Sequence, residues 1–182
     1  KALNLGLREA RGSVVFRVDA HARLSAGYLR RCVDALQEYG ADVVCGVMRT
    51  VPSAAGSMGR AIAVALAHPF GVGNSYFRIH VSLPTWVDTV FCGCYRREAF
   101  DRVLARGPSI GRKAEGRGDA DLETEGPFNV ALARGQDMDF STRLQKAGGR
   151  MLLLPDTSSE YFARSTIRSF WTQNWNNGVW AI

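Results

Sequence analysis

Apolar and polar positions follow two different periods along the first quarter of the chain. Apolar residues recur at helical spacing over residues 3–10, and a mostly apolar run over 13–18 predicts a buried strand. A second helical pattern covers residues 25–40, and a second strand pattern follows it over 42–48. A strand, a helix and a strand joined by short connections are typical of a parallel α/β unit.

The rest of the chain continues this mixture of helices and strands. We expect helices over residues 59–68, 97–104 and 137–147, and strands over 85–95 and 151–154. Residues 105–126 are polar and rich in glycine, which is typical of a flexible loop, and residues 165–182 carry aromatic residues at near-helical spacing. The pattern predicts a single α/β domain over residues 1–182 that includes this loop and an aromatic helical tail.

Composition narrows the classes of protein to which the chain can belong. With 182 residues, of which 46% are hydrophobic and 22% charged, it is globular rather than disordered. No apolar run approaches the ~20 residues that a bilayer span needs, and the first residues lack the features of a secretory signal.

The charge balance favours anionic partners without identifying one. The net charge is +6, and 20 of the 23 basic residues are arginine, which suits a phosphate-bearing ligand, nucleic acid or an anionic membrane surface. A GC-rich coding sequence explains scattered arginines equally well. Because the basic residues form no stripe and no known module, we expect no nucleic-acid partner.

The four cysteines, Cys32, Cys45, Cys92 and Cys94, lie in apolar or strand-like segments. Zinc sites usually show Cys-x-x-Cys pairs with further ligands at fixed spacing, and the sequence has no such pattern. We therefore expect buried, reduced thiols.

Asp19 and His21 come directly after the first predicted strand, with Arg17 just before them. Ligands of parallel α/β sheets bind at the carboxyl ends of strands, and residues i and i+2 of an extended segment point the same way. The pair could therefore hold one Mn²⁺ or Mg²⁺ ion that binds a diphosphate. The alternative is a polar strand end at which Asp19 caps the next helix and His21 is merely exposed.

Asp137 and Asp139 lie in the first turn of the amphipathic helix predicted over 137–147. A carboxylate is favoured there by the helix dipole, and it could accept a proton from a hydroxyl as the oxygen attacks. Simple capping of the helix would select the same residues.

Two further segments carry candidate binding residues. Glycines in the loop over 70–78 permit a close backbone approach, and Arg78 could pair with a phosphate, although the loop lacks a dinucleotide-binding fingerprint. In the tail, Gln173 and Trp175 combine an amide with an aromatic ring, which suits a sugar. A helix that packs on the core or lies at a membrane interface is the alternative for the tail.

The order of several short motifs resembles that of the family 2 glycosyltransferases, and within them the bacterial exopolysaccharide, succinoglycan-type branch. The resemblance covers nearly the whole chain and rests on residues 2–7, 18–22, 88–93 and 136–139, on Arg143-Leu144 and on Gly148-Gly149. It implies a GT-A fold, a nucleotide-sugar donor with UDP as the expected nucleotide, a divalent metal ion, and inversion at the anomeric carbon by direct displacement.

The resemblance also implies roles for individual residues. Asp19 and His21 occupy the metal-binding D-x-D position, and Asp137 occupies the position of the general base, where Gln136 replaces the usual glutamate. Donor binding is expected to involve Asp19, Arg17 and Arg78. The acceptor side is expected to include Asp88, Gly93, Gln136, Asp139, Gln173 and Trp175.

Family members begin with a strand and an acidic loop that hold the uracil and ribose, so the resemblance implies a truncated GT-A domain without its N-terminal strand. It further implies exopolysaccharide synthesis in the cytoplasm, at the inner face of the bacterial plasma membrane. The acceptor would be a saccharide or a lipid-linked saccharide, and membrane association would come through segments beyond this chain. The alternative is an inactive or truncated module that binds glycan or a partner without turnover. Because Asn176 stands where processive synthases have arginine, processivity is not predicted.

Overall fold

The computed structural model describes residues 2–72, 75–79, 81–106, 126–132 and 135–179. Its strands are β1 (Val14–Phe16), β2 (Ala22–Leu24), β3 (Val43–Pro52), β4 (Thr85–Val87), β5 (Cys94–Arg96) and β6 (Met151–Ala163). Its helices are α1 (Ala2–Glu9), α2 (Tyr28–Glu38), α3 (Ser57–Ala65), α4 (Pro69–Val72), α5 (Arg97–Arg106), α7 (Gln136–Lys146) and α8 (Ile167–Val179), with a 3₁₀ helix, η1 (Tyr76–Arg78).

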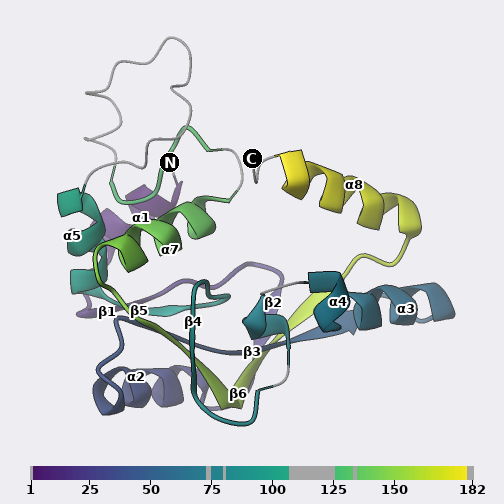
Figure 1. Ribbon diagram of the computed structural model, residues 1–182, viewed down its shortest axis with the longest axis horizontal. Helices are drawn as coiled ribbons and strands as arrows, with labels where there is room; N and C mark the ends of the chain where they lie inside the picture. The colour runs from purple at the N-terminus through teal and green to yellow at the C-terminus, as the bar shows by residue number, and fades with distance from the viewer. Residues whose placement is uncertain (1, 73–74, 80, 107–125, 133–134, 180–182) are drawn as a thin grey trace.

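The strands form one mixed sheet in the order β1-β5-β3-β6-β2, with β4 also paired to β6 (Figure 1). The two long strands, β3 and β6, are parallel, with an irregularity in their pairing between Gly46 and Val47. β1 and β3 both pair antiparallel with β5, so they run in the same direction. The α/β unit predicted over residues 13–48 is therefore present, but β5 lies between its two strands.

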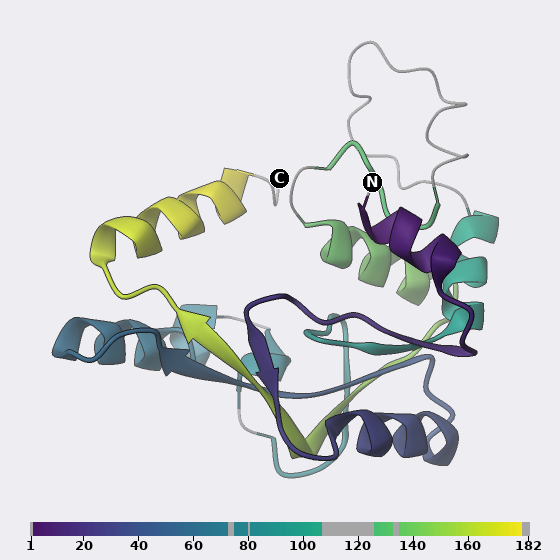
Figure 2. The ribbon, with the colours of Figure 1, turned by 180° about the vertical axis from the view of Figure 1, so that it is seen from behind.

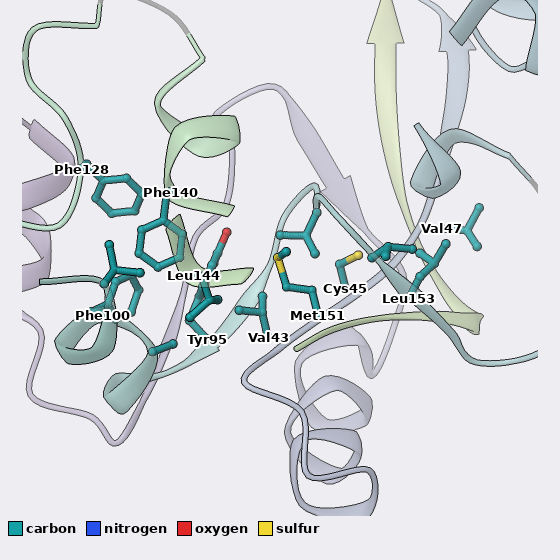
Figure 3. Close-up of a cluster of buried hydrophobic side chains, with 14 residues drawn as sticks. Val43, Cys45, Val47, Tyr95, Phe100, Phe128, Phe140, Leu144, Met151 and Leu153 are labelled. Carbon is teal, nitrogen blue, oxygen red and sulfur yellow. The ribbon is translucent and has the colours of Figure 1, made fainter. Parts of the chain in front are cut away.

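Helices cover both faces of the sheet. In Figure 2, α2 lies below the sheet, whereas α1, α5, α7 and α8 lie above it. The amphipathic face of α2 packs Tyr28, Cys32 and Leu36 against Val44 and Leu152. On the other face, aromatic side chains of α5, α7 and the segment before α7 pack against β3 and β6 (Figure 3). Burial of these apolar side chains fixes α7 above the sheet.

The prediction of one strand over residues 85–95 is wrong, because the segment forms two short strands, β4 and β5, with irregular backbone between them. Cys92 has a φ of 50°, which breaks the extended run. The Tyr28 hydroxyl donates to the Cys92 carbonyl over 3.1 Å and accepts the Gly46 N–H over 2.7 Å. A buried side chain of α2 thus holds the bend, and nothing in the apolar pattern indicates that contact.

Other boundaries also differ from the prediction. β6 extends from Met151 to Ala163, well beyond residue 154, because it pairs with both β3 and β2. α2 is capped by Gly27, which has a φ of 75°, and so begins later than the predicted helix over residues 25–40, whose first residue, Ser25, has its hydroxyl 3.0 Å from that of Thr157. The loop predicted over 105–126 falls almost wholly outside the described residues.

All four cysteines are buried and unpaired, as the sequence predicts. Burial raises the pKa of Cys45 to about 12 and that of Cys94 to about 11, so both remain thiols at neutral pH. Within the described ranges, no helix is both long and apolar enough to cross a membrane.

Candidate functional site

Arg17 joins two carboxylates that are far apart in the sequence. It follows β1 directly, and its backbone N–H donates to the Gly93 carbonyl over 3.0 Å. Its guanidinium Nη2 lies 3.2 Å from Asp19 Oδ1, and its Nη1 lies 3.6 Å from Asp137 Oδ2. The structure therefore brings together the residue expected to bind the metal and the residue expected to act as the base.

This arrangement remains open to solvent. The exposed side-chain fractions of Arg17, Asp19 and Asp137 are 25%, 27% and 39%, so an incoming ligand can reach each of them. Burial opposes the charge on Arg17, but the nearby Tyr95, Asp137 and Asp19 outweigh it and raise the pKa of the guanidinium. The cation between the two carboxylates is therefore permanent at any working pH.

α7 presents Asp137 outward and Asp139 inward. The helix starts at Gly135, whose φ of 73° is a left-handed conformation that favours glycine. The Asp139 carboxylate accepts from Arg143 Nη2 over 2.7 Å, and both side chains are nearly buried. Gln136 Nε2 donates to the Leu132 carbonyl over 2.7 Å. Asp139 and Gln136 thus hold the backbone around Asp137, and their acceptor-side roles stay predictions.

Asp19 and His21 are not on an extended segment, so the geometry expected for them is wrong. The Ala22 N–H donates to the Asp19 carbonyl over 2.9 Å, which closes a turn over these residues. His21 meets the ring of Tyr161 edge-on, with the ring centroids 5.5 Å apart. In the described part of the chain, no group of three or more acidic, histidine or cysteine side chains could hold a metal ion by itself.

Tyr161 of β6 links three of the predicted residues. Its hydroxyl accepts from Gln173 Nε2 over 2.8 Å, its ring meets His21, and the Arg78 guanidinium lies 5.3 Å from its centroid. Arg78 Nη1 is buried without a hydrogen-bond partner among the described residues, and burial lowers the pKa of Arg78. An anion would satisfy such a group. No pattern in the sequence indicates Tyr161, because the predicted strand ends at residue 154.

A cavity of about 830 Å³ opens between the end of β6 and α8. It is lined by His21, Ser53, Tyr161, Phe162, Ala163, Arg164, Thr166, Arg168, Ser169, Thr172, Gln173 and Asn176. His21 and Gln173, predicted for different parts of the site, therefore face the same space.

The remaining predicted residues lie in different surroundings. Gly93 is buried beside Arg17, and a Cβ atom there would lie 2.9 Å from the Tyr95 ring, so only glycine fits. Asp88 is exposed just after β4, whose last residue pairs with Met151 at the end of β6 remote from Tyr161. Trp175 is 64% exposed on α8. The structure does not bring Asp88 or Trp175 into contact with Arg17.

Two solved structures share this arrangement of strands and helices. A crystal structure of GalNAc-T7 with UDP, GalNAc and Mn²⁺ has a TM-score of 0.52 and 12% identity, and the match covers 90% of this chain and 30% of that one. A crystal structure of S. aureus TarS 1-349 in complex with UDP-GlcNAc has a TM-score of 0.51 and 16% identity, with 91% and 38% covered. At these identities the likeness shows the GT-A glycosyltransferase fold, and the chain spans well under half of either protein.

No curated protein matches the sequence. The profile of the family described as "Glycosyl transferase family 2" matches residues 1–104, more than half of the chain, including β1, Asp19, His21, Asp88 and Gly93. The chain therefore belongs to glycosyl transferase family 2.

Proposed function

We propose that this chain is the catalytic part of an inverting, metal-dependent glycosyltransferase that uses a nucleotide-diphosphate sugar. One observation carries the proposal: Arg17 places Asp19, on the expected donor side, next to Asp137, on the expected acceptor side. A displacement at the anomeric carbon needs charge neutralised on one side of the sugar and a base on the other. UDP and UDP-GlcNAc in the two similar structures support UDP as the nucleotide of the donor.

Asp137 is the residue best placed to act as the base. Its carboxylate is exposed at the start of α7, whereas that of Asp139 is committed to Arg143. Asp137 would take the proton of the acceptor hydroxyl while that oxygen forms a bond to the anomeric carbon. The bond from this carbon to the diphosphate oxygen breaks, and its electron pair leaves with the nucleotide. Because attack and departure occur on opposite faces, the configuration inverts.

Cationic side chains would hold the leaving diphosphate. Arg17 lies beside Asp19, and Arg78 Nη1, which is buried without a hydrogen-bond partner among the described residues, offers a further donor. Asp19 and His21 lie in one turn, so we infer that their side chains would supply at most two ligands to a divalent ion, which would take its others from phosphates and water. When bound, such an ion would neutralise charge on the diphosphate.

We further propose a role in bacterial exopolysaccharide synthesis at the inner face of the plasma membrane. The order of motifs over residues 2–149 supports this branch of the family. The hydroxyl and amide groups around Gln173 support a saccharide acceptor.

Calorimetry with UDP, with and without Mn²⁺, tests the donor site, and release of UDP from UDP-sugars tests turnover. We expect UDP to bind more tightly with Mn²⁺ than without it, and Asp19→Asn to remove this difference. Asp34→Asn, an exposed carboxylate of α2 on the opposite face, is the control and should leave binding unchanged. Binding without turnover in the presence of saccharide acceptors would instead favour a module that only binds. UDP affinity that is indifferent to Mn²⁺ would remove the metal from the proposal.

A further inference from the structure

The cavity between β6 and α8 has a polar and basic lining, of which only His21 is also expected to serve the donor site. Arg164, Arg168 and His21 contribute nitrogen groups. Hydroxyls come from Ser53, Thr166, Ser169 and Thr172, and amides come from Gln173 and Asn176. No lining residue is acidic. A space of about 830 Å³ is within the usual range for a small-molecule ligand.

The positive charge of this cavity is not balanced by nearby acids. Arg164 and Arg168 are exposed, and neither forms an ion pair with another described residue. Glu160 is the last acidic residue of the sequence, and its carboxylate lies 3.5 Å from Arg23 Nη1. The Glu160 carboxylate is thus paired with Arg23 of β2 and is not part of the cavity lining.

The walls are held in place by contacts of their own. The Tyr161 hydroxyl accepts from Gln173, which ties β6 to α8. The Thr166 hydroxyl accepts the Ser169 N–H over 3.2 Å, which caps the first turn of α8. The start of this helix lies at the cavity, so its dipole adds to the attraction for an anion.

We propose that this cavity binds the phosphate-bearing end of a saccharide acceptor. Arg164 and Arg168, which form no ion pair with another described residue, suit a phosphate group, whereas the hydroxyl and amide groups of the lining suit the hydroxyls of a sugar. His21 lines the cavity and follows Asp19 by two residues, so a saccharide bound there lies beside the donor site. The role of the cavity as an acceptor site rests on the proposed function, whereas the binding of a phosphate-bearing saccharide does not.

Calorimetry with glucose 1-phosphate tests this site, using the whole chain with UDP present at saturation so that the donor site is filled. We expect glucose 1-phosphate to bind and glucose to bind about tenfold more weakly, since the phosphate contacts are lost. The double variant Arg164→Gln/Arg168→Gln should weaken glucose 1-phosphate about tenfold and leave UDP affinity unchanged. The control Arg11→Gln/Arg30→Gln removes the same charge from exposed positions on other elements and should bind as the unmodified chain does.

The same phosphate chemistry occurs in lipid headgroups, so a second arm uses vesicles of phosphatidylglycerol and of phosphatidylcholine. Vesicle binding that depends on Arg164 and Arg168, without binding of glucose 1-phosphate, would overturn the saccharide assignment in favour of a headgroup. Equal affinities in the two double variants would overturn the site. If UDP fails to bind while glucose 1-phosphate still binds through these arginines, the proposed function fails and the site stands.

Discussion

Asp137 and Asp139 occupy the same helical turn, but their surroundings give them separate tasks. Asp137 is 39% exposed, and its Oδ2 lies 3.6 Å from Nη1 of the Arg17 guanidinium. We expect Asp137→Asn to lower sugar transfer by about 10²–10⁴-fold, the usual contribution of a positioned base. UDP affinity and the melting temperature should stay close to those of the unmodified chain. Near-normal turnover in this variant would remove Asp137 from the role of base.

Asp139→Asn should have the opposite profile, because its carboxylate is 12% exposed and pairs with an Arg143 side chain that is 7% exposed. Arg143 Nη2 also donates to the Pro127 carbonyl. An amide at position 139 leaves the buried guanidinium without its counter-charge, and we expect a loss of about 3 kcal/mol in the free energy of unfolding. Urea denaturation measures this loss of stability. A smaller loss in Asp139→Asn than in Asp137→Asn would contradict the structural role of Asp139.

The buried thiols predict how stability depends on pH. The pKa of Cys45 rises from 9.0 to about 12 in the folded chain. Between these two values the Cys45 thiol keeps its proton in the folded state and loses it in the unfolded state. Its contribution to the free energy of unfolding is therefore complete below pH 9 and declines as the pH rises towards 12. Between pH 9 and 11, the stability advantage of the unmodified chain over Cys45→Ala should shrink by about 1.4 kcal/mol per pH unit. Urea denaturation at pH 8, 9, 10 and 11 measures this difference, which would stay constant if the thiol were accessible.

At the scale of elements, the sequence pattern predicts most of the helices, because the buried residues of a helix recur at regular spacing along the chain. α5, α7 and α8 form close to where the apolar residues recur. The sequence pattern does not predict β2 or the far half of β6, since their extended state depends on pairing between distant segments, β2 with β6 and β6 with β3. The same reason explains why residues 85–95 were predicted as one strand: the bend at Cys92 depends on a hydroxyl from α2.

The candidate site was predictable only where its residues follow a local signal. Asp19 follows a strand and Asp137 starts a helix, so both were identified. Tyr161, Arg164 and Arg168 have no such signal, because the cavity forms only where the end of β6 meets α8. The contacts of Arg17 with Asp19 and Asp137 also could not be predicted from the sequence, since they require α7 to lie above the end of β1.

Gly46 lies where the pairing of β3 and β6 becomes irregular, and the two strands approach too closely for a side chain. A Cβ atom would lie 2.5 Å from the Thr157 carbonyl oxygen. We expect Gly46→Ala to destabilise the chain by about 2–3 kcal/mol, as overpacking does when backbone must move. The control is Gly6→Ala on α1, which has nothing within 4 Å of the added atom and should stabilise by about 0.5–1 kcal/mol. Equal urea midpoints for the two variants would show that β6 can shift freely.

At the scale of the whole molecule, polar contacts hold the first and last parts of the chain together. Arg17 reaches α7 through Asp137, and Arg97 Nε donates to the Gly12 carbonyl. Leu3 and Leu7 of α1 pack against the apolar cluster that includes Phe140 of α7, and the two helices overlap in the views of Figures 1 and 2. The position of Asp137 therefore depends on residues that the sequence places at the other end of the chain.

Asn4 makes the most buried of these long-range contacts. Its side chain is 2% exposed, donates to the Phe128 carbonyl over 2.8 Å and accepts the Phe128 N–H over 3.0 Å. Asn4→Ala leaves both backbone groups buried without partners, so we expect a loss of about 3 kcal/mol in the free energy of unfolding. The Phe128 amide should also exchange with solvent faster, because local opening then costs less. Leu5→Ala, 54% exposed on the same helix, is the control and should change neither quantity. Unchanged protection of Phe128 in Asn4→Ala would show that the apolar cluster alone fixes this segment beneath α1.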